Sequence, residues 1–153
     1  MITLLSQFCL ALFATLGFAV IFRVPIKSIP VCIVVGGLGW IAYLITEYYL
    51  GSPVLGCFIG ACVVGFCSSL AAYIFKEATT IFIIPGILCL VPGAKIFNTM
   101  EALLKSEIKE MAEIGIDTLL MAGAIAMGLL VMGACINVIR ALIHKTVTLK
   151  DKF

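Results

Sequence analysis

Charged side chains are scarce in this sequence: Asp, Glu, Lys and Arg make up 12% of the 153 residues, and there is one histidine. Soluble domains carry about 25% charged and about 45–50% apolar residues, whereas 63% of this chain is hydrophobic. A chain of this length cannot bury so much apolar surface in its own core, because small domains keep a large surface-to-volume ratio. The composition therefore excludes a soluble domain and predicts a single membrane domain over residues 1–153.

The same scarcity excludes several functions. A net charge of +2 is too small to indicate a nucleic-acid partner. No nucleophile–base pair, phosphate-binding loop or pair of carboxylates lies within an apolar segment, so the sequence gives no support for an enzyme. The seven cysteines lie in apolar segments without a Cys-x-x-Cys pair or a nearby histidine. We interpret them as free thiols that pack as small hydrophobic side chains, and we expect no metal and no cofactor.

Long apolar segments define the spans. A bilayer core of about 30 Å needs about 20 apolar residues of helix. Four segments have this length, residues 2–22, 29–50, 53–75 and 118–139, and a fifth, residues 81–97, is shorter and interrupted. The first has no basic region or cleavage site of a signal peptide, so we expect it to be retained as a span. The sequence predicts an all-α integral membrane protein with about five transmembrane helices, the fourth of them broken.

Basic residues predict how these helices are oriented. If residues 81–97 cross the membrane, the basic residues that follow the first, third and last spans all lie on one face. These residues are Arg23, Lys27, Lys76, Arg140, Lys145, Lys150 and Lys152. Because Lys and Arg concentrate on the cytoplasmic side, the N-terminus is expected outside and the C-terminus in the cytoplasm.

Between the fourth and last spans, residues 98–115 have the pattern of an amphipathic surface helix. Asn98 is placed to cap its start, and Glu101 and Lys105 form a favourable pair four residues apart. The pattern fits a lid or a partner-docking helix. It fits better an interfacial helix that only returns the chain to the membrane.

Small residues at helical spacing predict close packing. Gly56 and Gly60 are four apart, Gly65 follows in the same segment, and Gly128 lies four residues after Ala124 in the last span. Glycines at this spacing let helix backbones approach closely, which matters because lipid supplies no hydrophobic drive for helix association. We expect a tight bundle that also packs against partner helices or other copies of the chain.

The interrupted fourth segment contains two Pro-Gly pairs, Pro85-Gly86 and Pro92-Gly93. Proline has no amide hydrogen, so Pro85 leaves the carbonyl of Ile81 without its helical donor, and Pro92 does the same to Leu88. Non-helical backbone at membrane depth is tolerated only where protein or water satisfies it. The segment therefore predicts either a simple kink or a break that forms a binding site.

A break here directs the N-terminal end of its second half-helix towards the membrane centre, where it favours an anionic group. Lys95 lies in the first turn of that half-helix, and Asn98 and Thr99 follow on the same face. Lys95 either contacts a substrate or extends to the outer headgroups. The candidate substrate-binding residues are Pro85, Gly86, Leu88, Pro92, Gly93, Lys95, Asn98 and Thr99.

The segment IFIIPGILCLVPGAKIFNTM, together with the VPIKSIP turn after the first span, resembles the threonine/serine exporter (ThrE-like) family. The resemblance is to its small YjjB-type subunit and covers nearly the whole chain. Pro85, Gly86, Pro92 and Gly93 match the double Pro-Gly pattern of the family, whereas Cys89 stands where a proline is expected.

This resemblance implies a multi-pass protein of the bacterial cytoplasmic (inner) membrane that works beside a larger subunit corresponding to the N-terminal half of single-chain exporters. It implies export of threonine and serine, and in some two-subunit members of succinate, driven by the proton motive force as in an antiporter. The alternative from the residues alone is a non-transporting structural subunit of a membrane complex.

Overall fold

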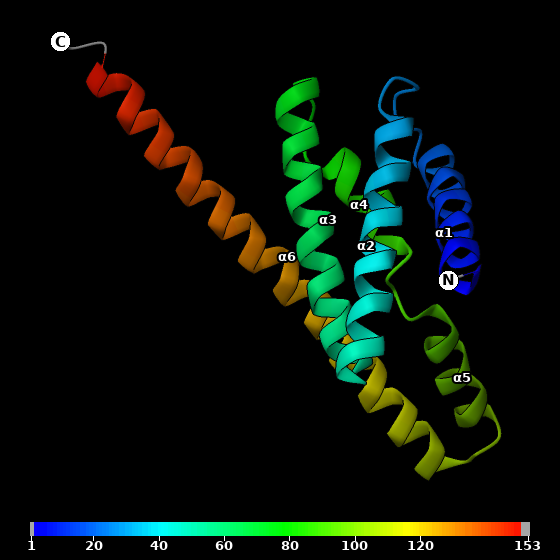
Figure 1. The fold of residues 1–153 in the computed structure, drawn as a ribbon. Coiled ribbons are helices and arrows are strands. Elements are labelled where there is room, and N and C mark those ends of the chain that lie inside the picture. Colours follow the sequence, from blue (N-terminus) through cyan, green and yellow to red (C-terminus); the bar gives the residue numbers. More distant parts are fainter. Residues whose placement is uncertain (1, 151–153) are drawn as a thin grey trace.

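The computed structural model describes residues 2–150, which form six helices (Figure 1). In chain order these are α1 (Ile2–Ile21), α2 (Ile29–Leu50), α3 (Pro53–Phe75), α4 (Thr80–Leu88), α5 (Gly93–Leu104) and α6 (Ile108–Lys150). The prediction of an all-helical membrane protein with a broken fourth segment is confirmed.

Helix ends in this chain follow local chemistry. The Ser52 hydroxyl accepts a hydrogen bond from the Leu55 amide at 3.5 Å, and Pro53 occupies the first position of α3. Three other ends have a non-glycine residue in the left-handed conformation, with φ of 53° at Arg23, 54° at Lys76 and 62° at Ser106. In each case the following amide donates to a carbonyl five residues back, as in a Schellman motif.

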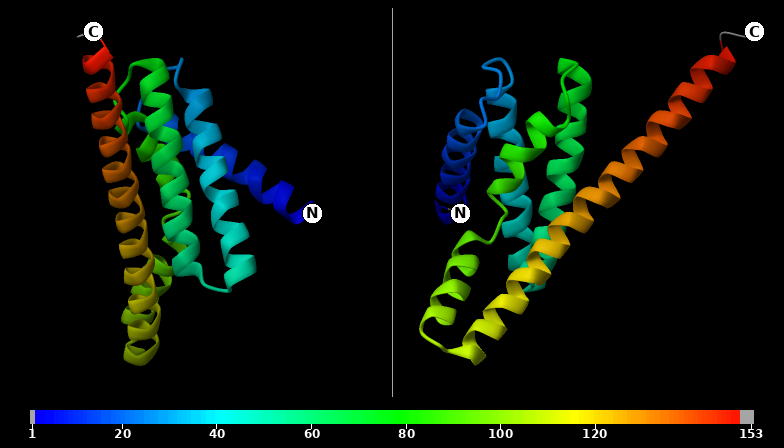
Figure 2. Two further views of the ribbon diagram at one scale, coloured as in Figure 1. Left: turned by 60° about the vertical axis from the view of Figure 1, so that its left-hand side comes forward. Right: turned by 180° about the vertical axis from the view of Figure 1, so that it is seen from behind.

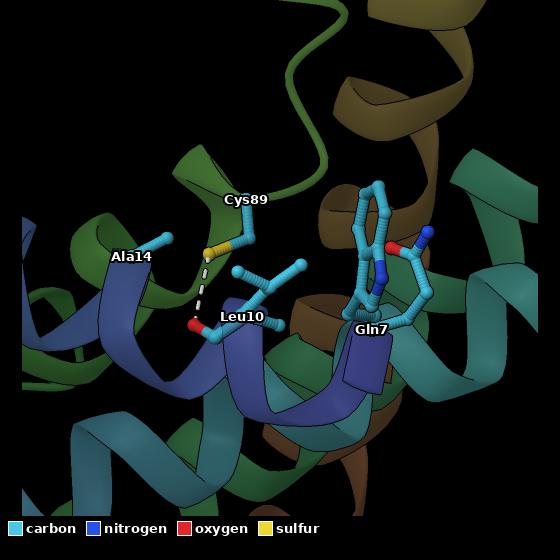
Figure 3. A pocket seen from close by; sticks show the side chains of 6 residues that line it. Gln7, Leu10, Ala14 and Cys89 are labelled. Atoms are coloured by element: carbon cyan, nitrogen blue, oxygen red, sulfur yellow. Dashed lines mark hydrogen bonds between the residues drawn. The ribbon is translucent and has the colours of Figure 1, made fainter. Parts of the chain in front are cut away.

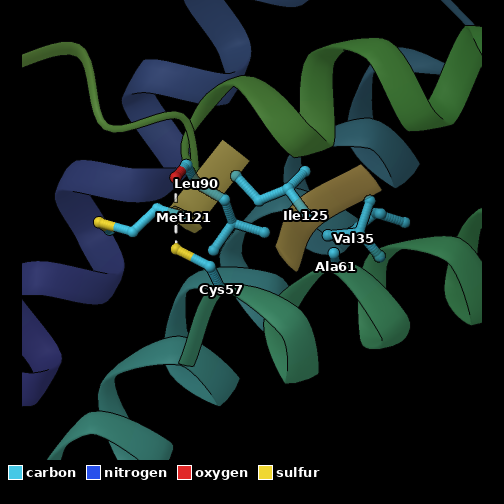
Figure 4. Packing of buried hydrophobic residues seen from close by; sticks show 7 residues of the cluster. Val35, Cys57, Ala61, Leu90, Met121 and Ile125 are labelled. Carbon is cyan, nitrogen blue, oxygen red and sulfur yellow. Dashed lines mark hydrogen bonds between the residues drawn. The ribbon is translucent and has the colours of Figure 1, made fainter. Parts of the chain in front are cut away.

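Helices α2 and α3 form the centre of the bundle. Helix α1 packs on α2, α4 packs against α2, α3 and α1, and α6 lies along α3. Away from these contacts α1 leans outwards towards its N-terminus, and α6 diverges from α3 towards its C-terminus (Figure 2). The main core brings together α2, α3, α6 and the segment between α4 and α5 (Figure 4). Its buried residues are Val35, Cys57, Ala61, Val64, Leu90, Met121 and Ile125.

Within the described residues, three helices are long and apolar enough to cross a membrane: α2, α3 and residues Ile108–Ile139 of α6. A fourth span results if α4 and α5, which meet at 56°, cross together. Helix α1 is apolar and 20 residues long, and its stretch Leu5–Ile21 is a shorter apolar helix than these spans. The chain is thus a multi-pass membrane protein, and the crossing of α1 stays a prediction.

The amphipathic region differs from the prediction. Residues 98–115 are not one helix: α5 begins at Gly93, runs through Asn98 and ends at Leu104, and the rest belongs to α6. Asn98 does not cap a helix, because α5 already begins directly after Pro92 and Asn98 lies inside it. The predicted pair is present, with Lys105 Nζ 2.7 Å from Glu101 Oε1. Helix α6 is 43 residues long, about 65 Å, and so extends well beyond a bilayer core.

Candidate functional site

The break between α4 and α5 lies later than the first Pro-Gly pair. Pro85 remains inside α4, which continues to Leu88. Pro85 has no amide hydrogen to donate to the Ile81 carbonyl. This carbonyl instead accepts a hydrogen bond from the thiol of Cys32 on α2, at 3.5 Å. A neighbouring helix thus supplies the missing donor, and α4 passes through its proline without ending.

The non-helical segment runs from Cys89 to Pro92. The Leu90 amide donates to the Ile87 carbonyl at 2.8 Å, and the Gly93 amide donates to the Val91 carbonyl at 2.8 Å. Pro92 has φ −75° and ψ 62°, outside the helical region, and α5 starts directly after it. The second Pro-Gly pair, and not the first, therefore lies at the break, and a residue before proline is disfavoured in the helical conformation.

Leu90 anchors this segment in the core. Its side chain is 3% exposed and lies where α2 and α3 approach through Gly39 and Gly60. A Cβ added to Gly60 would lie 2.9 Å from Leu90 Cδ2 and 3.0 Å from the Gly39 carbonyl oxygen. The Cys57 thiol also contacts the Leu90 carbonyl oxygen at 3.9 Å (Figure 4). The small residues of α2 and α3 therefore make the room that the break occupies.

On its other side the break is held by α1. Cys89 Sγ lies 3.0 Å from Thr15 Oγ1 and 3.7 Å from the Ala11 carbonyl oxygen, and the Thr15 hydroxyl donates to the same carbonyl at 2.8 Å. Gly36 of α2 faces Thr15 so closely that no Cβ would fit there. The chain has cysteine where its family resemblance led us to expect proline, and that thiol ties the break to α1.

A pocket of about 170 Å³ opens beside Cys89 (Figure 3). It is lined from α1 by Gln7, Leu10, Ala11 and Ala14, from α2 by Trp40, and from the break by Cys89. In this view Ala14 and Gln7 are furthest apart, with Cys89 and Leu10 between them (Figure 3). The pocket combines an apolar wall with a few polar groups, as ligand sites commonly do.

Trp40 lines this pocket and carries a buried polar atom. Its ring stacks on Tyr43, with centroids 5.2 Å apart and planes at 28°, and packs against the main core. Its Nε1 is buried and has no hydrogen-bond partner within the described part of the chain. Buried indole nitrogens usually have one, because an unpaired buried donor costs about 1–3 kcal/mol.

The start of α5 holds the predicted charged residue. Lys95 Nζ forms an ion pair with Asp117 Oδ2 of α6 at 3.1 Å, and the Thr99 hydroxyl donates to the Lys95 carbonyl at 2.8 Å. The Lys95 side chain is 35% exposed. Helix α5 packs against α6 and against no other helix in the described residues. The amides of Ala94 and Lys95 have no preceding helical carbonyl to bond, as at any helix N-terminus.

The structure separates the sequence-derived candidates into groups. Pro85 and Gly86 are buried in α4, where Gly86 packs against Val35 and Val64. Leu88 and Pro92 are half-buried on either side of the break, Gly93 and Asn98 are exposed, and Lys95 and Thr99 lie on the α5–α6 contact. None of these eight residues lines the pocket.

Four glycines were predicted to pack helices, and each lies against a neighbour. A Cβ at Gly56 would lie 2.9 Å from the Tyr43 ring, and one at Gly65 would lie 3.3 Å from Met132. At Gly128 it would lie 2.6 Å from the Phe58 carbonyl oxygen. Gly60 faces Gly39 and Leu90, as described above.

Sequence reasoning did not identify Gln7 and Trp40. A signal was present, because Trp40 is the single tryptophan and Gln7 is an amide within the first apolar segment. Polar side chains in such segments usually face protein or a cavity. Nothing in the sequence, however, indicated that α1 and α2 meet at the break. No group of three or more metal-ligating side chains is found in the described part of the chain.

Comparison with known proteins identifies the family. A family model described as "Threonine/Serine exporter, ThrE" matches residues 7–135. A curated relative from Haemophilus influenzae, described as "Uncharacterized protein", is 24% identical over 141 residues, which cover 87% of this chain and 48% of the relative. The chain thus spans about half the length of that relative. No solved structure matches the chain. Since the family model covers most of the 153 residues, this multi-pass membrane protein belongs to the threonine/serine exporter family.

Proposed function

We propose that this chain is the small subunit of a two-subunit secondary exporter for small carboxylate-bearing metabolites: threonine and serine, with succinate as a further candidate. Export is driven by the proton motive force. The observation that carries the proposal is the non-helical segment from Cys89 to Pro92, held inside the bundle and adjoining a pocket, in a chain of the exporter family.

Membrane chemistry supports a substrate site at this segment. In lipid, unpaired backbone N–H and C=O groups are costly, and a continuous helix pairs them all. A break is therefore kept only where protein, water or a ligand bonds these groups. Here Leu90 anchors the break in the core, and Thr15 holds Cys89. The first amides of α5 remain available to an anionic group, and the positive end of the helix favours that charge. Lys95 assists more weakly than a free lysine, because Asp117 already pairs with it.

The positions of the turns support the proposed orientation. The α1–α2 turn, the α3–α4 turn and the C-terminal end of α6 lie at the same end of the bundle (Figure 1). The first two carry Arg23, Lys27 and Lys76. Basic residues gather on the cytoplasmic side, so we propose that this end faces the cytoplasm and that the N-terminus of the chain is outside. The membrane is the bacterial cytoplasmic membrane.

Two observations support a larger partner subunit. The chain spans about half the length of its curated relative, so the other half of that relative is long enough to hold a second membrane unit. Helix α6 also leaves large apolar side chains uncovered, with Leu130 67% and Val138 59% exposed. Lipid or helices of another subunit cover such a surface, and small residues such as Gly133 on the same stretch allow close approach.

Transport into inverted vesicles tests the proposal. Vesicles would contain this chain, a larger exporter subunit corresponding to the N-terminal half of single-chain exporters, both, or neither, and a pH gradient would be imposed across the membrane. Uptake of labelled threonine, serine and succinate would be measured in each. We expect uptake of at least one substrate only when both subunits are present, with loss of uptake when the gradient is collapsed by an uncoupler.

The same vesicles separate the exporter from a structural subunit. If the partner alone transports at full rate while the two proteins co-purify, the chain is a structural component and the proposal is wrong. If the intact complex transports none of the three substrates, the substrate class is wrong. A current through this chain alone, without a proton gradient, would indicate a channel instead.

A further inference from the structure

We propose that the N-terminal part of α1 is a gate, which moves away from the broken segment about Gly17 and is held closed by the contact between Thr15 and Cys89. This inference rests on the proposed transport function and names the element of this chain that moves during transport. Helix α1 forms one wall of the pocket beside the break, so its movement opens that wall. The inference is independent of which metabolite is transported.

The break is held rigidly on one side only. Leu90 lies in the main core between α2 and α3, where a Cβ added to Gly60 would lie 2.9 Å from its side chain. Among the described residues, none from α1 belongs to this core. Helix α1 packs on α2 and α4 alone in the described part of the chain, and towards its N-terminus it leans away from the bundle (Figure 2). Because a close-packed core resists deformation, movement at the break falls on the α1 side.

The face of α1 that packs on the bundle is made mainly of small side chains. Its buried residues in the described range are Ala11, Thr15 and Ala19, spaced four apart. Phe8 and Leu12 also reach α2 but are only half-buried. Lipid replaces the apolar surroundings that a membrane helix gives up, so separation of this face is opposed by lost packing and not by a hydrophobic drive.

Thr15 and Cys89 form the polar contact between α1 and the break. Their Oγ1 and Sγ atoms lie 3.0 Å apart, and the Thr15 hydroxyl donates its single hydrogen to the Ala11 carbonyl at 2.8 Å. The thiol is therefore the donor in the contact with Thr15, and a thiol is a weak donor. When α1 moves away, Thr15 keeps its hydrogen bond inside α1, and only the weak bond from Cys89 is lost. The contact thus holds the gate closed but can open at low cost.

Gly17 lies between this contact and the end of α1 that stays fixed. Ala19 is fully buried in a second cluster with Cys32 and Phe82, which anchors the C-terminal end of α1. A Cβ at Gly17 would meet nothing within 4 Å in the described part of the chain, so packing does not require glycine there. Glycine inside a helix weakens it relative to alanine. We therefore assign Gly17 as the hinge, since hinges are often small residues beside a fixed element.

Bending at Gly17 moves most of one pocket wall together. Four of the six lining residues belong to α1 and precede Gly17: Gln7, Leu10, Ala11 and Ala14. The other two, Trp40 and Cys89, belong to α2 and the break and stay in place. The closed pocket of about 170 Å³ holds about six water molecules at about 30 Å³ each. Opening of the gate enlarges it without disturbing the main core.

A disulfide between α1 and the break tests whether the gate must open. A sulfur in the place of Thr15 Oγ1 would start 3.0 Å from Cys89 Sγ, near the disulfide bond length of about 2.05 Å. Thr15→Cys, in the complex with the larger subunit, would be oxidised with copper phenanthroline and the linked peptides identified by mass spectrometry. We expect transport to be lost on oxidation and to return on reduction. Oxidised wild type, which controls for the other cysteines, should keep its rate.

A stiffer hinge gives a graded test that needs no oxidation. Alanine favours the helical state over glycine by about fivefold, so Gly17→Ala should slow transport by about that factor without loss of stability. Gly123→Ala in α6 is the matched control, because a Cβ there also meets nothing within 4 Å. This variant should transport at the wild-type rate. If Gly17→Ala does so too, Gly17 is not a hinge and the gate is wrong.

Alkylation of cysteines measures opening without transport. Cys89 lies on the α1 side of the break, whereas Cys57 is fully buried on the core side against the Leu90 carbonyl. The purified complex would be treated with N-ethylmaleimide and the modified peptides followed over time by mass spectrometry. We expect Cys89 to react, Cys57 to stay unmodified, and Gly17→Ala to slow the reaction of Cys89 about fivefold. Equal rates at Cys89 in wild type and Gly17→Ala would overturn the gate.

These measurements separate the gate from the proposed function. If the wild-type complex transports none of the three metabolites, but the reaction of Cys89 slows in Gly17→Ala as expected, the gate stands and the exporter function fails. If the wild-type complex transports and the fully linked Thr15→Cys variant transports equally well, the gate fails and the exporter function stands.

Discussion

Replacing Gly128 by alanine tests how closely α6 must approach α3. A Cβ at this position would lie 2.6 Å from the Phe58 carbonyl oxygen and 2.9 Å from the Ala61 Cβ. To restore ordinary contact, the helices must separate by about 0.8 Å at this point, because backbone atoms cannot rotate away as a side chain does. The Cys62 thiol, 3.5 Å from the Gly128 carbonyl oxygen, would lose its contact as well.

Overpacking of this kind costs about 1–3 kcal/mol. It is opposed by the higher helix propensity of alanine, worth up to about 1 kcal/mol. Two control variants on the same helix isolate that gain, since a Cβ at Gly123 or Gly133 meets nothing within 4 Å. We expect Gly123→Ala and Gly133→Ala to be neutral or slightly stabilising, and Gly128→Ala to be less stable than either by about 1–3 kcal/mol.

Thermal unfolding of the purified chain in detergent measures the difference. For a chain of this length 1 kcal/mol corresponds to a shift of about 2–4 °C in Tm, so Gly128→Ala should melt several degrees below the controls. If all three variants melt at the same temperature, α6 is not held against α3 at this point. The reasoning from close backbone approach would then be wrong.

Three further predictions concern α4 and α5. Cys32→Ala should destabilise the bundle by about 1–2 kcal/mol in chemical unfolding, because it removes a fully buried side chain and the donor to the Ile81 carbonyl. Pro92→Ala should reduce the 56° bend between α4 and α5, because Val91 is then free to become helical. Spin labels on exposed sites of α4 and α5 would show this as a longer distance between the labels, and transport should fall. The hydrogen bond to Glu101 and the negative charge of Glu101 raise the pKa of Lys105 above its usual 10.5. The pair therefore stabilises α5 fully below about pH 10.5, and this contribution is lost as the pH rises through the raised pKa. Helix content measured against pH should show that loss in the wild type and not in Glu101→Gln.

Each of these predictions has a control that the chain itself offers. Cys9 is exposed, so Cys9→Ala should leave stability unchanged; an equal loss in both cysteine variants would contradict the role given to Cys32. Pro30 lies exposed at the start of α2, where replacement should not alter the path of the helix. An unchanged label distance in Pro92→Ala would show that packing of Leu90, not proline, keeps the break. For Lys105, identical pH profiles of wild type and Glu101→Gln would show that the pair contributes nothing.

Helix positions in this protein follow closely from local sequence. The second and third spans were predicted at residues 29–50 and 53–75, the bounds of α2 and α3, because each is an apolar segment of the length that a bilayer requires. The end of α5 before Ser106 was harder to predict. Ser106 places a side-chain-bearing residue in the left-handed conformation, which sequence patterns assign to glycine. The division between α5 and α6 at Ser106 was therefore missed.

The sequence alone determined that this is a helical membrane protein with its fourth segment interrupted, because composition, hydropathy and the chemistry of proline act locally. It could not determine where the interruption falls or what surrounds it. Whether Pro85 ends a helix depends on the thiol of Cys32, which lies 49 residues earlier in the chain. The pocket depends on Gln7, Trp40 and Cys89 meeting, and that contact exists only after α1, α2 and α4 have packed. Tertiary structure decided these features, since the free energy of a buried polar group depends on partners that are distant in sequence.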